Sequence, residues 1–177
     1  MKKPVGCILI ATVLLGCVTK VEENQFVVIL NKGRIVNIID DSDTYKKRPF
    51  EYAILYPKGI QTAKVNDLSV MTGDKRVYAI NVSGKWNITD PEQYYISVDT
   101  LERGTILIQD ILENSVRKTL AWLDSDVIEP ALNENASAKD DVINKVFEHI
   151  NDENTSSWLL NIGAAIIDLD IEAQTDQ

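Results

Sequence analysis

Residues 77–95 constrain the fold more than any other stretch, because they predict a half-buried strand that leads directly into a helix. Apolar side chains recur there at a spacing of two, so one face of the strand is expected in the core and the other in solvent. The apolar positions are Tyr78, Ile80, Val82, Trp86 and Ile88. Asp90 supplies an N-cap carboxylate and Pro91 fits the first helical position, while Gln93 stands where a capping box has its partner. The strand is therefore predicted to end, and a helix to begin, near Asp90.

Further strands and two amphipathic helices are predicted on either side of this stretch. Short apolar runs bounded by turn residues predict antiparallel strands. These runs cover residues 26–30, 34–39, 50–56, 60–65, 68–71 and, near the end of the chain, 164–172. Helical spacing of apolar residues predicts one helix over 101–123 and a second one around Val142 and Ile150, with Pro130 and the polar stretch 133–137 between them. We therefore predict an α+β fold in which a bent, mainly antiparallel sheet packs against two amphipathic helices.

The first seventeen residues predict a membrane anchor. Lys2 and Lys3 precede fourteen largely apolar residues, 5–18, which as a helix would span about 21 Å against a hydrocarbon core of about 30 Å. Residues 14–17, LLGC, resemble a bacterial lipobox, which makes Cys17 the candidate lipidation site. The alternative is an uncleaved signal anchor. In both cases positive residues stay in the cytoplasm, so the rest of the chain is expected on the extracytoplasmic side, membrane-anchored through its N-terminus.

Charge is distributed unevenly along the chain. The formal net charge is −9, and residues 124–177 contribute 13 acidic residues against Lys139 and Lys145, a net of −11. An acidic surface of this kind repels phosphate backbones, so nucleic acid is not an expected partner. The basic run of residues 46–48 has two interpretations: it contacts anionic lipid head groups, or it forms a solvated loop.

No catalytic, cofactor or metal site is predicted, and we do not expect an enzyme. His149 is the only histidine, and the two cysteines, Cys7 and Cys17, both lie in the apolar N-terminal segment. A serine or cysteine nucleophile needs a nearby base, and structural zinc sites need His and Cys ligands. Asp168 and Asp170 lie two apart on one face of the predicted last strand, where they form either a carboxylate pair or solvated acids at the strand edge.

The order of these elements resembles the SPFH or Band 7 family of stomatins and prohibitins, and within it the HflC-like subgroup. The similarity covers about residues 21–172. The matching features are Gly33 after the first strand, Ile60-Gln61-Thr62, Lys85-Trp86 followed by Ile88-Thr89-Asp90 and Tyr94-Tyr95, and the 112–123 helix leading to Asp126-Val127-Ile128. With the N-terminal segment taken as above, the predicted organisation is a signal peptide with lipobox or a signal anchor at 1–17, a linker at 18–25, an SPFH-like domain at 26–172 and a tail at 173–177.

The resemblance implies a membrane-anchored scaffold in a bacterial cell envelope that acts by oligomerisation. Its implied partners are further copies or an HflK-like SPFH protein, and a membrane protease of the FtsH type that it modulates. Family members continue after the last strand into a long charged helix, so we expect either a truncated form or a short relative that joins assemblies through its globular domain. The surfaces expected to carry contacts are the acidic C-terminal third and the edge strand ending at Ile171. The alternative is a small-ligand-binding envelope lipoprotein without catalytic activity.

Overall fold

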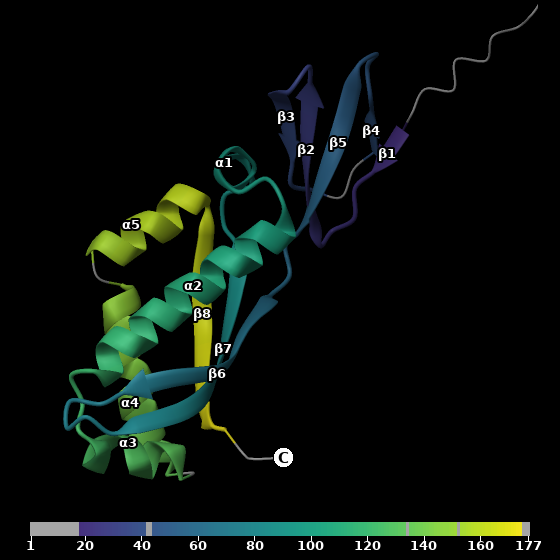
Figure 1. The fold of residues 1–177 in the computed structure, drawn as a ribbon. Coiled ribbons are helices and arrows are strands. Elements are labelled where there is room, and N and C mark those ends of the chain that lie inside the picture. Colours follow the sequence, from purple (N-terminus) through teal and green to yellow (C-terminus); the bar gives the residue numbers. More distant parts are fainter. Residues whose placement is uncertain (1–17, 42–43, 134, 152, 175–177) are drawn as a thin grey trace, which may run out of the picture.

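The structure, a computed structural model, describes residues 18–174 except 42–43, 134 and 152. The N-terminal strands are β1 (Val18–Lys20), β2 (Gln25–Asn31), β3 (Arg34–Ile39), β4 (Thr44–Lys46) and β5 (Glu51–Pro57). The later strands are β6 (Gln61–Met71), β7 (Val77–Ile88) and β8 (Ala164–Ala173). The helices are α1 (Pro91–Ser97), α2 (Leu101–Leu120), α3 (Ser125–Leu132), α4 (Ala136–Ile150) and α5 (Glu153–Ile162). The chain is elongated, with the first five strands at one end and the helices at the other (Figure 1).

The first five strands form two small antiparallel sheets instead of joining one continuous bent sheet. One sheet has the order β3-β2-β5, and β1 pairs with β4 in the other. The central strand β2 is buried on both faces. Val27 and Ile29 pack in a small cluster with Val21, whereas Val28 and Leu30 belong to the main core. This explains why β2 has an unbroken apolar run.

Residues 18–25, predicted to be a linker, are instead partly built into the fold. Val18 pairs with Lys46 and Lys20 with Thr44, which makes β1 the partner of β4. Val21 is buried in the small cluster beneath β2. A strand of three residues carries too little periodicity to be detected in a sequence, and its existence here depends on a partner more than twenty residues away.

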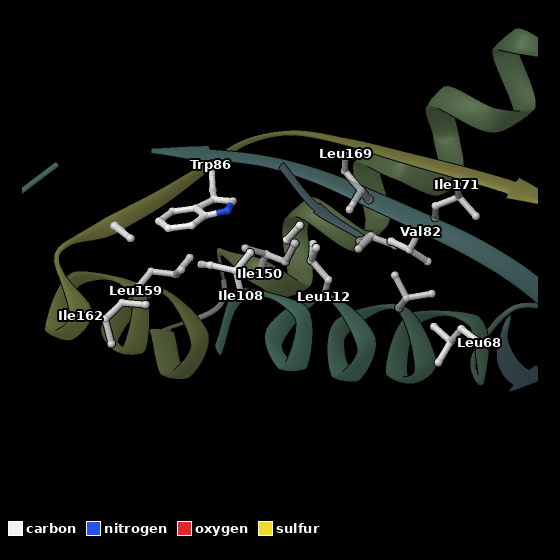
Figure 2. Packing of buried hydrophobic residues seen from close by; sticks show 14 of the residues in the cluster. Leu68, Val82, Trp86, Ile108, Leu112, Ile150, Leu159, Ile162, Leu169 and Ile171 are labelled. Atoms are coloured by element: carbon white, nitrogen blue, oxygen red, sulfur yellow. The ribbon is translucent and has the colours of Figure 1, made fainter. Parts of the chain in front are cut away.

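The third antiparallel sheet, β6-β7-β8, carries the helices on one face (Figure 1). The predicted alternation of β7 is confirmed: its even-numbered residues from Ile80 to Ile88 are all buried. Figure 2 shows Trp86, Val82 and Leu169 extending from the sheet toward Ile108 and Leu112 of α2. A Cβ atom on Gly84 would lie 2.6 Å from Leu112 Cδ1, so glycine at this position allows α2 to approach the sheet closely.

The two predicted amphipathic helices are present as α2 and α4, but α3 and α5 were not predicted. Pro130, expected to separate the helices, lies inside α3. Both missed helices are short, and each is held by a few buried contacts: Ile128 and Ala131 from α3, Leu159 and Ile162 from α5. Short segments show little helical periodicity, and tertiary packing provides most of their stability.

Helix α1 begins as predicted. Asp90 Oδ1 accepts hydrogen bonds from the backbone N–H groups of Glu92 and Gln93, both at 3.0 Å. Gln93 has a different role from the predicted capping box. Its Nε2 donates to the carbonyl oxygen of Asn161 at 2.7 Å, which ties α1 to α5.

Three buried aromatic residues join the N-terminal strands to the rest of the chain. Tyr94 of α1 stacks on Trp86 at 6.2 Å between ring centroids, and the Tyr56 ring meets Tyr94 edge-on at 5.2 Å. The Tyr56 hydroxyl donates to the carbonyl oxygen of Asp99, and the Tyr94 hydroxyl to that of Thr100. Burial raises the pKa of both tyrosines, that of Tyr94 to about 12. The junction is therefore a packed and hydrogen-bonded contact.

Candidate functional site

Cations gather at one end of the N-terminal strands. The register pairs Asn31 with both Arg34 and Glu51, so the β2–β3 and β4–β5 turns lie at the same end. Val18 pairs with Lys46 there, which brings the start of the described chain to this end as well (Figure 1). We call the following group the basic end: Lys32, Arg34, Lys46, Lys47 and Arg48.

Two tight turns position the basic end. Lys32 and Gly33 have φ angles of 51° and 79°, typical of the two-residue turns that join right-twisted strands, so the predicted hairpin is confirmed. In the second turn, Glu51 Oε2 accepts hydrogen bonds from the Tyr45 hydroxyl at 3.1 Å and from the Arg48 backbone N–H at 2.7 Å. Burial, with a contribution from the Glu51 carboxylate, raises the pKa of Tyr45.

Phe50 projects from the second turn into solvent. Its side chain is 81% exposed and its φ is 69°, a left-handed conformation that is unfavourable for a bulky residue. An aromatic side chain beside several cations suits a membrane surface, because aromatic rings favour the interface and cations attract anionic head groups. The acidic α3, α4 and much of β8 lie toward the opposite end of the molecule (Figure 1).

An open groove between α2 and α5 is a second candidate surface. Its volume is about 320 Å³. The lining residues are Leu107, Asp110, Ile111, Asn114, Ser115, Lys118, Trp158 and Ile162. Trp158 is 65% exposed, and Leu160 on the same helix is also exposed. The groove was not predicted from the sequence because α5 was not predicted. The signal available in the sequence was Trp158, an aromatic residue shortly before the last strand.

Asp168 and Asp170 each form an ion pair with a different lysine. Lys85 Nζ lies 2.7 Å from Asp168 Oδ2, and Lys139 Nζ lies 2.6 Å from Asp170 Oδ1. The hydrogen bond from Lys85 lowers the pKa of Asp168, which favours its ionised form. Each carboxylate is thus paired with its own lysine.

The other residues considered in the sequence are His149 and the two cysteines. His149 lies half-buried on α4, between the exposed Glu148 and the buried Ile150. Within the described residues, no group of three or more His, Cys, Asp or Glu side chains is placed to hold a metal ion. Cys7 and Cys17 lie outside the described residues, so the structure does not test lipidation. Of the helices described, none has the length and apolar character needed to cross a membrane.

The SPFH domain / Band 7 family matches residues 19–175. Protein HflC of Treponema pallidum (strain Nichols) is 29% identical over 114 residues, which make up 64% of this chain and 34% of that protein. The chain thus spans about a third of that relative's length. Both comparisons confirm the resemblance expected from the sequence, and the family match begins within the segment that was predicted to be a linker. Since the family match covers most of the chain, this protein belongs to the SPFH domain / Band 7 family.

Proposed function

We propose that this chain is the membrane-anchored scaffold domain of an HflC-like protein, which acts by assembly and without catalysis. The observation that carries the proposal is the basic end with its exposed Phe50. The apolar N-terminal segment joins the described chain at Val18, which pairs with Lys46 at this same end. The point at which the predicted anchor joins the described chain, the cations and the aromatic side chain therefore all lie at one end of the molecule.

The charge distribution supports an orientation in which the basic end faces the membrane. A cation held close to an anionic membrane surface contributes up to about 1 kcal/mol of binding free energy. The basic end would face the extracytoplasmic leaflet, with the acidic C-terminal third held away from the lipid. The anchor itself is either acyl chains on Cys17 or the apolar segment retained as a helix.

Assembly is the second part of the proposal. The resemblance to HflC-like proteins implies partnership with further SPFH chains, including an HflK-like one, and through them modulation of a membrane protease of the FtsH type. The similarity to Protein HflC of Treponema pallidum supports the HflC-like assignment on which this rests. The groove between α2 and α5 offers the exposed Trp158 for protein contacts, and Leu160 is exposed on the same helix.

The anchor is tested by Cys17→Ser in the full chain, followed by mass spectrometry and membrane fractionation. Acylation predicts loss of the lipid mass and release of protein from the membrane. A signal anchor predicts unchanged membrane retention, which would contradict the lipobox interpretation while leaving an anchored domain.

The basic end is tested by replacing Lys46, Lys47 and Arg48 with Gln and measuring resistance of membrane-bound protein to high-salt extraction. We expect easier extraction of this variant. The control replaces Lys75, Arg103 and Lys118 with Gln, which changes the net charge equally at positions outside the basic end. Equal extraction of both variants would argue against a membrane-facing basic end.

Assembly is tested by light scattering on detergent-solubilised protein during size-exclusion chromatography, together with affinity purification. A mass of several chains, or co-purification of an SPFH partner, is expected. A strict monomer without such a partner would contradict the scaffold role and favour the ligand-binding lipoprotein.

A further inference from the structure

Strand β8 lies at the edge of the β6-β7-β8 sheet, where one side of its backbone has no strand partner among the residues that the structure describes. Unpaired N–H and C=O groups on such an edge are a template for another strand, either in regulated assembly or in aggregation. What happens to the outward N–H groups of β8 therefore decides whether this edge is open to a partner.

The hydrogen-bond pattern identifies these outward groups. The Gln174 N–H donates to the carbonyl oxygen of Ala79 at 3.1 Å, and in an antiparallel pair every second residue pair exchanges such bonds. The register then assigns bonded pairs to Asn81 with Glu172, to Ser83 with Asp170 and to Lys85 with Asp168. Leu169 and Ile171 fall between these bonded pairs, so their N–H groups point away from β7, toward the free edge.

The N–H groups of Leu169 and Ile171 are both occupied by side chains of their own strand, whereas Ala173, the third residue turned outward by this register, lies at the end of β8. The Leu169 N–H donates to Asp168 Oδ1 and the Ile171 N–H donates to Asp170 Oδ1, each at 3.0 Å. Short acidic side chains compete in this way with a partner strand for neighbouring backbone donors. The ion pairs with Lys85 and Lys139 hold the two carboxylates in place.

A bulge and the strand's own charge add to this protection. The pairing steps from Lys85 with Asp168 to Trp86 with Ile166, which leaves Ile167 as an extra residue that interrupts the ladder. If two copies of β8 met edge to edge in antiparallel fashion, the acidic side chains of one copy would approach those of the other. Like charges on facing strands are destabilising.

We propose that Asp168 and Asp170 keep the edge of β8 closed to strand addition, and that the partner they exclude is the β8 strand of a second copy. A second copy fits because two identical edges pair about a two-fold axis, and each supplies backbone carbonyls to the other's freed N–H groups. This inference goes beyond the proposed scaffold role, because it removes the β8 edge from the surfaces that assembly uses.

The test compares the full chain with its Asp168→Ala/Asp170→Ala variant by light scattering across a concentration series. Freeing two donors corresponds to roughly ten- to hundred-fold stronger self-association beyond that of the unmodified protein. Hydrogen–deuterium exchange is expected to show that the peptide containing β8 becomes more protected as concentration rises. An Asp140→Ala/Asp141→Ala variant loses the same charge on α4 and is expected to behave like the unmodified protein.

Three further variants keep the proposal decidable if the double alanine variant does not fold. Asp168→Ala and Asp170→Ala each free one donor and are expected to show a smaller increase. Asp168→Asn/Asp170→Asn retains the acceptor oxygens and loses only the charge, so it is expected to associate less strongly than the double alanine variant. Folded alanine variants with unchanged association, or an equal increase in the Asp140/Asp141 control, would overturn the proposal. Failure of the membrane or partner tests would not affect it.

Discussion

The N-terminal strands and the β6-β7-β8 sheet bury their apolar side chains in different ways. The β6-β7-β8 sheet places one face under α2 and its neighbouring helices, and together with these helices it contributes most of the main core. The N-terminal strands have no helical layer of their own, and they bury β2 between a small cluster around Val27 and the junction at Tyr56. Stability is therefore expected to reside mainly in the helix-covered sheet, which leaves the ends of the N-terminal strands free for surface contacts.

The two regions also differ in where their aromatic side chains lie. Trp86 and Tyr94 are fully buried and hold the second region together, whereas Phe50 is exposed in a left-handed turn of the first. Unfavourable backbone conformations often persist at functional positions. Packing in the core thus explains Trp86 and Tyr94, whereas packing does not explain the exposed Phe50.

The largest expected effect is that of Trp86→Ala. Trp86 fills the space between β7, α2 and α1, and truncating a buried tryptophan costs about 3–5 kcal/mol of unfolding free energy. Chemical denaturation measures this loss. Trp122→Ala is the matched control, because Trp122 is 86% exposed and its removal is expected to change stability little. Equal losses of unfolding free energy in the two variants would contradict the proposed difference between core and surface aromatic residues.

The second prediction concerns alkaline pH and the junction. Below the ordinary tyrosine pKa of 10.0 the stabilisation from neutral Tyr94 is fully present, and it is lost as the pH rises toward the folded pKa of about 12. In that window the unfolded chain releases the proton that the folded chain retains. Stability is therefore expected to fall between pH 10 and 12, and Tyr94→Phe is expected to reduce this fall. An unchanged pH profile in the variant would contradict it.

The third prediction concerns the contact between the N-terminal strands and the rest of the chain. Tyr56→Phe keeps the ring that meets Tyr94 but removes the hydrogen bond to the Asp99 carbonyl. The expected loss is about 1 kcal/mol, and calorimetry should still show a single transition because the ring contact remains. Two separate transitions would show that the hydroxyl, and not the ring, couples the regions.

The smallest effect is expected at Phe50, and it has the opposite sign. Phe50→Gly removes a left-handed bulky residue and is expected to raise stability by roughly 0.5 kcal/mol while weakening membrane retention. Phe50→Ala is the matched control, since it loses the aromatic ring but keeps the backbone conformation unfavourable. Salt extraction of membranes and thermal unfolding together distinguish the two contributions. Lower stability in the glycine variant would indicate that Phe50 packs against a neighbour.

Elements with strong local signals were predicted well. The alternation of β7, the Asp90 cap, the Lys32-Gly33 hairpin and the stripe of α2 each depend on residues close in the chain. The missed elements, α3, α5 and the β1–β4 pair, are short and are held by distant partners. Gly84 shows the same limit, because only the approach of Leu112 explains the missing side chain.

The candidate surfaces divide in the same way. The basic run at 46–48 was visible in the sequence, but its proximity to Lys32, Arg34 and the start of β1 follows from strand register. Asp168 and Asp170 were recognised as strand-edge acids, whereas their bonds to their own outward backbone are a property of the folded sheet. The groove beside Trp158 could not be predicted without α5.

The sequence by itself determined the class of elements and their order, because hydrophobic period, caps and turns act over a few residues. It also determined the family, through the order of those elements. The tertiary structure alone decided how the strands divide into separate sheets, which cations share one end, and which lysine pairs with each aspartate. These features depend on contacts between segments far apart in the chain, and their free energy appears only when the core between them is packed.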